Sequence, residues 1–146
     1  MQKNNLQGAT AYLANKIKFP VFSSVNDLLQ KDILLNMLNF VTIEQVKRNF
    51  LRYQEETKKV GKAAWKECVV DLVQCAKSHI VLSMANFFAE GIQTVNDKDL
   101  VNVLNKLFCL FCLVQLENQW RILLEEGKNT SVLHLLHERC CKQSKE

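Results

Sequence analysis

The stretch AAWKECVVDLVQCAKSHIVLSMANFFAEGIQ, residues 63–93, decides the fold class. Its apolar side chains recur at steps of three and four residues, which is the period of one face of an α-helix. They are Trp65, Cys68, Val69, Leu72, Ala76, Ile80, Val81, Met84, Phe87, Phe88 and Ile92. The pattern predicts one long amphipathic helix, with its apolar face, including Trp65, in the core.

A second long helix is predicted directly after the first. Asn96-Asp97 supplies an N-cap for a helix over residues 98–126, and Gly127 stands where a C′ glycine ends a helix. Before the first long helix, Gly61 predicts a bend or a break, because glycine costs about 1 kcal/mol in a helix interior. Two helices of more than 25 residues favour a bundle of near-antiparallel members.

Two capping boxes stand earlier in the chain. Ser24-x-x-Asp27 is typical of the start of a helix, here one that runs to Phe40 and is apolar around most of its circumference. Thr42-x-x-Gln45 is a second such signal and predicts a separate, more polar helix to Val60. The sequence therefore predicts two helices in this region rather than one.

Short helices are also expected at the two ends of the chain, over residues 6–18 and 132–142. Pro20 ends the first, since the residue before a proline avoids the α region. With only 4 Gly and 1 Pro in 146 residues, a turn-rich sandwich or barrel is excluded. We expect an all-α bundle of five to six helices, with a helical domain over residues 1–127 and a short helix with a polar tail over 128–146.

Composition excludes several classes of function. Apolar residues make up 48% and charged residues 23% of the chain, which is typical of a globular domain and not of a disordered one. The net charge of +4 comes from scattered bases, so no nucleic-acid stripe is expected. The most apolar run, Leu107–Leu116, has ten residues, and a bilayer needs about 20. This run is predicted to be a buried core helix. No signal peptide is visible at the N-terminus.

The cysteines are expected to be reduced thiols in an intracellular protein. The chain has 6 of them, and four lie in apolar helical patterns, where free Cys behaves as a small hydrophobe. Cys109-x-x-Cys112 has the spacing of redox and zinc sites, but Phe108 and Phe111 surround it and no turn accompanies it. The core interpretation is favoured.

Two other groups could carry chemistry. His134, His137, Cys140 and Cys141 share one short helix, whose single face cannot close a tetrahedral metal site. His79 has Cys75, Ser78 and Ser83 as neighbours in the chain, but no third group is identifiable that would orient a base. We therefore predict no catalytic residue and no metal site, and assign no cofactor-binding residue.

A series of residues along the two long helices carries a resemblance to a known family by its order and spacing. It consists of Ala64-Trp65, Asp71-Leu72-Val73, Ala76, His79, Phe87-Phe88, Asp97, Val103-Leu104, Leu107 and Cys109-Leu110. Leu6-Gln7 and Thr10-Ala11-Tyr12-Leu13 are similar to the start of the same region. The chain resembles the C-terminal helical domain of peroxisomal acyl-CoA oxidases and oxidase-like proteins, over residues 44–126 and more weakly over 1–19. Beyond residue 128 the resemblance ends.

The resemblance implies a function for a larger protein. Acyl-CoA oxidases use FAD to desaturate fatty acyl-CoA between C2 and C3 and pass the electrons to oxygen, which gives hydrogen peroxide in peroxisomal β-oxidation. Their C-terminal helices pack subunits into dimers and complete the flavin site. The family's catalytic glutamate precedes the segment matched by residues 6–13, whereas the first Glu of this chain is Glu44. We expect a truncated form that is inactive alone and binds no FAD by itself.

The end of the chain differs from the family as well. Family members typically end in S-K-L, a peroxisomal address, whereas this chain ends in Gln143-Ser144-Lys145-Glu146. The resemblance implies a peroxisomal protein, while the altered end leaves a cytoplasmic location open.

Three interpretations remain open at this point. The first is a C-terminal module that packs on the remaining domains of an oxidase; it expects an uncovered apolar face at Val25–Phe40, with Phe19 and Phe22 beside it. The second is a helical interaction or dimerisation module that pairs with itself or with oxidase chains through a Phe108–Phe111 stripe. The third is a carrier of lipid or acyl chains inside the bundle.

Overall fold

A computed structural model of the chain describes residue 19 and residues 29–125. These residues form four α-helices and one 3-10 turn: α1 (Lys31–Val60), η3 (Gly61–Ala63), α2 (Ala64–Gln93), α3 (Lys98–Asn118) and α4 (Trp120–Glu125). No strand occurs among them, so the predicted all-α class is confirmed. The helices expected over 6–18 and 132–142, the Ser24-x-x-Asp27 cap and the boundary near Gly127 lie outside the described residues.

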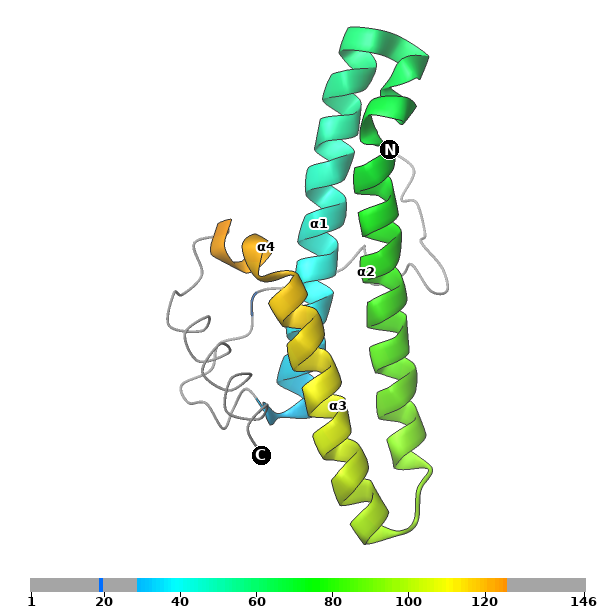
Figure 1. Cartoon of the computed structure of the whole chain (residues 1–146), viewed down its shortest axis with the longest axis vertical. Helices are drawn as coiled ribbons and strands as arrows, with labels where there is room; N and C mark the ends of the chain where they lie inside the picture. The colour runs from blue at the N-terminus through cyan, green and yellow to red at the C-terminus, as the bar shows by residue number, and fades with distance from the viewer. Residues whose placement is uncertain (1–18, 20–28, 126–146) are drawn as a thin grey trace, which may run out of the picture.

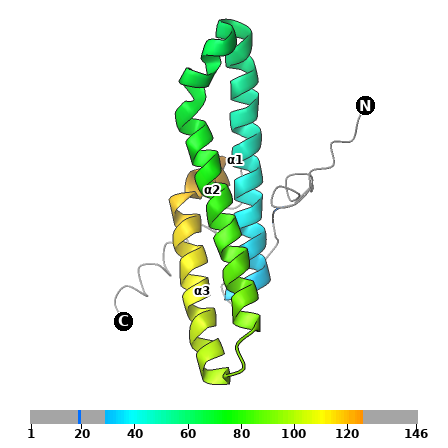
Figure 2. The same cartoon turned by 90° about the vertical axis from the view of Figure 1, so that its right-hand side faces the viewer.

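The helices α1 and α2 form a long antiparallel hairpin, and α3 packs along one half of it (Figures 1 and 2). Each of α1 and α2 has 30 residues, whereas α3 has 21. At 1.5 Å per residue these lengths correspond to about 45 Å and about 32 Å. Of the described helices, α1 and α2 alone lie side by side in the half of the hairpin next to η3, while α3 joins them in the other half.

The hydrophobic core lies in the three-helix half. It is built from Leu34, Met37, Leu38 and Phe40 of α1, Leu82, Ala85, Ala89 and Ile92 of α2, and Phe108, Cys112, Leu113 and Leu116 of α3. Phe108 is 0% exposed, and its ring meets that of Phe88 edge to face, 5.6 Å between centroids. Three helix faces thus close around one aromatic pair, which fixes the position of α3 on the hairpin.

The face expected to be uncovered at Val25–Phe40 is buried in its described part. Leu34, Met37 and Phe40 are at most 3% exposed, and Phe19 packs edge to face on Phe40 with 5.3 Å between ring centroids. That prediction was wrong because α2 and α3 both pack against this part of α1. An apolar helix surface needs a cover, and here the chain itself supplies one.

In the two-helix half, α1 and α2 meet through polar side chains. The Asn49 amide Nδ2 donates to the backbone oxygen of Asp71 at 3.2 Å, and the Arg52 guanidinium pairs with the Asp71 carboxylate. Further toward the core, Ser78 Oγ donates to Gln45 Oε1 at 2.6 Å. These bonds set the register of the hairpin in the half that α3 does not reach.

The two helices predicted on either side of Thr42 are one continuous helix. Thr42 is 1% exposed and lies inside α1, where its Oγ1 donates to the carbonyl oxygen of Leu38 at 2.8 Å. A threonine hydroxyl can bond back to the preceding turn as readily as it can cap a helix. The capping-box prediction at Thr42-x-x-Gln45 was therefore wrong, and Gln45 turns toward α2 instead.

The break predicted at Gly61 is confirmed. Gly61 has φ +59°, a backbone conformation in which a Cβ is strained, and its N–H donates to the carbonyl oxygen of Thr57. The following helix α2 begins at Ala64 and ends at Gln93, as the sequence predicted. Gly61 thus lets the chain reverse between the two longest helices.

The start of α3 was predicted correctly and its end was not. Asp97 Oδ1 accepts from the backbone N–H groups of Asp99 at 2.9 Å and Leu100 at 3.2 Å. The predicted single helix to residue 126 is interrupted at Gln119, where φ is −114°, and α4 starts again at Trp120. Nothing in the local pattern marked this position, because Gln119 lacks the strong breaker character of glycine or proline.

Replacing Asp97 with alanine is expected to lower the free energy of unfolding by about 1 kcal/mol, because two N–H groups of the first turn lose their acceptor. Urea unfolding followed by circular dichroism measures this change. Asp97→Asn keeps the acceptor and should lose less, only the part due to the charge at the helix N-terminus. Equal losses in the two variants would show that Asp97 acts through its charge and not as a cap.

Candidate functional site

The residues around His79 do not form a nucleophile and base. Ser78 gives its hydroxyl proton to Gln45 Oε1, and Ser83 gives its own to the backbone oxygen of His79, at 3.0 Å. Cys75 Sγ accepts from Asn49 Nδ2 at 3.0 Å. Both hydroxyl protons are thus directed to acceptors other than an imidazole, so neither serine is activated for attack.

Cys112 is buried and Cys109 is partly buried on α3, and both are free thiols. Burial raises the pKa of Cys109, and burial together with the neighbouring Cys109 raises the pKa of Cys112 to about 12. Cys109 Sγ lies 3.3 Å from the carbonyl oxygen of Leu29. Redox and zinc sites require a stabilised thiolate, and here the environment favours the thiol. The core interpretation of this motif agrees with the structure.

No group of three or more His, Cys, Asp or Glu residues suited to a metal ion occurs within residues 29–125. His134, His137, Cys140 and Cys141 lie outside the described residues. The absence of a metal site thus stays a prediction.

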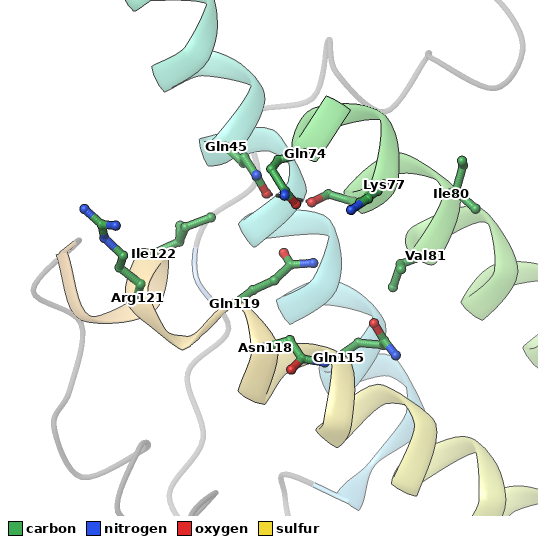
Figure 3. A pocket seen from close by; sticks show the side chains of 11 residues that line it. Gln45, Gln74, Lys77, Ile80, Val81, Gln115, Asn118, Gln119, Arg121 and Ile122 are labelled. Atoms are coloured by element: carbon green, nitrogen blue, oxygen red, sulfur yellow. Dashed lines mark hydrogen bonds between the residues drawn. The ribbon is translucent and has the colours of Figure 1, made fainter. Parts of the chain in front are cut away.

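One cavity lies where α3 gives way to α4. Its volume is about 620 Å³, within the range of about 300–1,000 Å³ of small-molecule sites. Five of its lining residues are carboxamides: Gln45, Gln74, Gln115, Asn118 and Gln119. We call it the amide cavity (Figure 3).

The remaining lining residues give the amide cavity a basic and partly apolar character. Lys77 and Arg121 are cationic, Ser78 is hydroxylated, and Ile80, Val81 and Ile122 are apolar. None of the described lining residues is acidic. Four helices contribute to it: α1 through Gln45, α2 through residues 74–81, and α3 and α4 through residues 115–122. This cluster could not be predicted from the sequence, since its members are far apart in the chain.

A second cavity, of about 370 Å³, lies between α1 and α2. Asn36, Asn39 and Asn86 line it together with Asp32, Leu35 and Leu82. Asn39 Oδ1 is buried there without a hydrogen-bond partner among the described residues. A single carboxylate is too few for a strong cation site, so this cavity is assigned no ligand.

The outer face of α3 is apolar and exposed. It carries five side chains at alternating steps of three and four, which we call the α3 stripe: Leu100, Val103, Leu107, Leu110 and Val114. Leu107 is 49% and Leu110 is 42% exposed. The run Leu107–Leu116 is therefore buried on one face only, and the prediction of a fully buried helix was wrong in that respect.

The Phe108–Phe111 stripe expected to pair with a partner is not free. Phe108 is fully buried, and Phe111 is partly buried against the same core, with its ring 6.5 Å from that of Phe88. The aromatic residues point inward and the aliphatic residues of the α3 stripe point outward. A partner for α3 would therefore meet leucine and valine, not phenylalanine.

The helix α2 also exposes large apolar side chains, which are Trp65, Val69, Val70, Val73, Ile80, Met84 and Phe87. Phe87 is 71% exposed and Trp65, predicted to be in the core, is 57% exposed. Trp65 lies at the start of α2, in the half of the hairpin that α3 does not reach (Figure 1). Such a concentration of exposed apolar residues marks a surface that packs against another protein surface.

By length and composition alone, two stretches could cross a membrane, Lys31–Gln93 and Lys98–Asn118, and 22% of the most apolar window of each is buried. Core helices of soluble proteins pass the same test, so these stretches are weak evidence for a membrane. The first of them spans the polar α1–α2 contacts and the break at Gly61, which a continuous membrane helix does not contain.

The described residues form an all-α domain in which α2 and α3 expose large apolar side chains. The chain belongs to the acyl-CoA oxidase family, since the family model of acyl-CoA oxidases matches residues 30–145. The family suggested by the resemblance is thus confirmed, and the match extends beyond residue 128, where the resemblance was expected to end.

Two solved structures show a similar fold. Acyl-CoA oxidase 1 of Yarrowia lipolytica gives a TM-score of 0.78 at 24% sequence identity, over 89% of this chain and 20% of the oxidase chain. Acyl-CoA oxidase 3 of the same organism gives 0.75 at 26% identity, over 94% of this chain and 21% of the oxidase chain. This chain therefore spans about a fifth of the length of these oxidases. No match was found among the curated proteins.

The lining of the amide cavity does not fit the ring system of FAD. The isoalloxazine ring is flat and needs a slot lined by apolar or aromatic groups, whereas the amide cavity presents five carboxamides, and none of its described lining residues is aromatic. We therefore assign no flavin contact within residues 29–125.

Proposed function

We propose that this chain is the C-terminal helical region of an acyl-CoA oxidase-like flavoprotein. The whole protein would use FAD to desaturate fatty acyl-CoA, with release of hydrogen peroxide, in peroxisomal fatty-acid β-oxidation. The family match and the two similar oxidase folds support this assignment. Within the whole protein, the helices of this chain pack on the other domains, and the chain alone is inactive.

One observation carries this proposal: α2 and α3 expose large apolar side chains to solvent. Phe87, Met84 and Leu107 are each about half exposed or more, although large apolar side chains normally leave water on folding. Remaining domains of an oxidase would cover these side chains. The supporting face thus differs from the one expected at Val25–Phe40.

A domain exchange tests the proposal directly. Residues 30–125 replace the superposed helical segment of acyl-CoA oxidase 1 of Yarrowia lipolytica, and hydrogen peroxide release from a fatty acyl-CoA is measured. We expect the chimaera to keep bound flavin and to turn over, since the domain supplies packing and not chemistry. A chimaera that folds but retains no flavin band would refute the role in an oxidase.

The isolated chain provides a second test. It is mixed with FAD, desalted and examined by visible absorption before and after addition of acyl-CoA. We expect no flavin band, because the described residues offer no flavin slot. A retained band that bleaches with acyl-CoA would show that the isolated chain is an active oxidase.

A dimerisation module without flavin chemistry is the second candidate, favoured by the α3 stripe. Its spacing of three and four residues over two heptads is that of a helix seam that meets another helix. In this case the partner is a second copy of the chain or an oxidase chain.

The double variant Leu107→Glu/Leu110→Glu is expected to abolish self-association, because two carboxylates would be buried in the seam. Sedimentation velocity over a concentration series measures the dimer fraction. Lys106→Glu is the control, since Lys106 is exposed on the same helix outside the α3 stripe. A wild-type chain that stays monomeric at the highest concentration would contradict the dimer and leave the packing role in an oxidase.

A further inference from the structure

The amide cavity contains a buried acceptor that the chain does not satisfy. Gln119 Oε1 is buried and has no hydrogen-bond partner among the described residues. Buried polar atoms are hydrogen-bonded in nine cases out of ten or more, so an unsatisfied one requires an explanation. A ligand that donates a proton to Gln119 Oε1 supplies it.

The backbone fixes Gln119 in this position. It stands at the interruption between α3 and α4, where its N–H donates to the Leu116 oxygen and its own carbonyl accepts from Ile122, both at 3.1 Å. In the view of Figure 3 its carboxamide lies between the side chains of Gln45 and Gln74 and those of Gln115 and Asn118. The break between α3 and α4, which was not predicted from the sequence, thus presents the carboxamide of Gln119 to the other four carboxamides of the cavity.

The charges around the cavity select the sign of a ligand. Lys77 lines it, and none of the described lining residues carries a negative charge. Ile80, Val81 and Ile122 supply a small apolar wall. Carboxamides both donate and accept hydrogen bonds, and they match hydroxyl groups, which do the same.

We propose that the amide cavity binds a small organic anion that carries hydroxyl groups. Lys77 pairs with the anionic group, which is a phosphate ester or a carboxylate, and Gln119 Oε1 accepts from a hydroxyl. The remaining carboxamides bind further hydroxyl groups. This site is separate from the α3 stripe and from the packing role proposed above.

Three probes that share hydroxyl groups test the site: glycerol 3-phosphate, glycerate and glycerol. The full chain is labelled with ¹⁵N, and the side-chain amide signals of glutamine and asparagine are followed by NMR during titration. We expect saturable shifts of the Gln119 signal with an anionic probe and none with glycerol. The anion that binds more tightly identifies the phosphate or the carboxylate class.

Matched variants locate the site. Lys77→Met and Gln119→Leu should each weaken binding by about tenfold, the effect of one charge-assisted or buried hydrogen bond. Lys66→Met, on the same helix but outside the cavity lining, should bind as the wild type does. Circular dichroism verifies that each variant folds, and Gln119→Glu, which repels an anion, replaces any variant that does not.

Other outcomes would overturn the proposal. They are equal binding of glycerol, the absence of saturable shifts with both anions, and unchanged binding in Lys77→Met and Gln119→Leu.

Discussion

Replacing Phe108 with alanine is expected to lower the free energy of unfolding by about 3–5 kcal/mol. Phe108 is fully buried where α1, α2 and α3 meet, and its ring packs edge to face on Phe88. Truncation removes the transfer free energy of the ring and leaves a cavity that three rigid helices cannot close. A loss of this size is a large part of the about 5–15 kcal/mol that stabilises a typical domain.

Urea unfolding, followed by circular dichroism at a concentration where the chain is monomeric, measures this loss. Leu107→Ala is the matched control: it truncates the adjacent residue, which is 49% exposed, and should cost less than about 1 kcal/mol. If Phe108→Ala does not fold, Phe108→Leu should still fold. Its free energy of unfolding should fall by less, since leucine fills more of the site. Similar losses for Phe108→Ala and Leu107→Ala would contradict the placement of α3 on the hairpin.

Periodicity and turn chemistry were sufficient to predict most of the helices. The steps of three and four residues over residues 63–93 place α2 to within one residue, because a helix of this length has many positions that agree. Asp97 marks the start of α3, because a short side chain with a hydrogen-bond acceptor directly before an apolar run is typical of an N-cap. Gly61 marks the turn, because the chain there needs a positive φ, which glycine adopts without strain.

The failures occurred where a local signal had two physical outcomes. Thr42 can cap a helix or bond back within one, and burial of its side chain between α1 and α2 decided for the second. Gln119 breaks a helix without any breaker residue nearby. Both outcomes depend on neighbours that are distant in the chain, which a local pattern does not contain.

Which apolar face is covered could not be predicted from the helices singly. Leu107 and Phe108 are consecutive and equally apolar, yet one is half exposed and the other is fully buried. The two side chains lie on different faces of α3, so the face that α3 turns toward the hairpin decides which of them is covered. The amide cavity escaped prediction for the same reason, since Gln45, Gln74 and Gln115 meet only after the three helices have packed.

The stability of the chain should fall above pH 9, in part because of Cys112. Burial raises the pKa of this thiol from 9.0 to about 12. Between these values the unfolded chain releases the proton and the folded chain keeps it, so the unfolded state binds fewer protons and stability decreases with pH. The contribution of this thiol to the free energy of unfolding is fully present below pH 9. It is lost at about 1.4 kcal/mol for each pH unit up to about pH 12.

The variant Cys112→Ala isolates this contribution. At pH 8 the wild type should be more stable by about 1 kcal/mol, because the variant loses buried volume. Between pH 8 and pH 10 this difference should shrink by about 1.4 kcal/mol and change sign, since only the wild type has the buried thiol. Ile92→Val, a buried truncation without a titrating group, should differ from the wild type by the same amount at both pH values. A constant difference for Cys112→Ala as well would show that its thiol ionises in the folded chain as readily as in the unfolded one, and would contradict the tight packing of α3 around it.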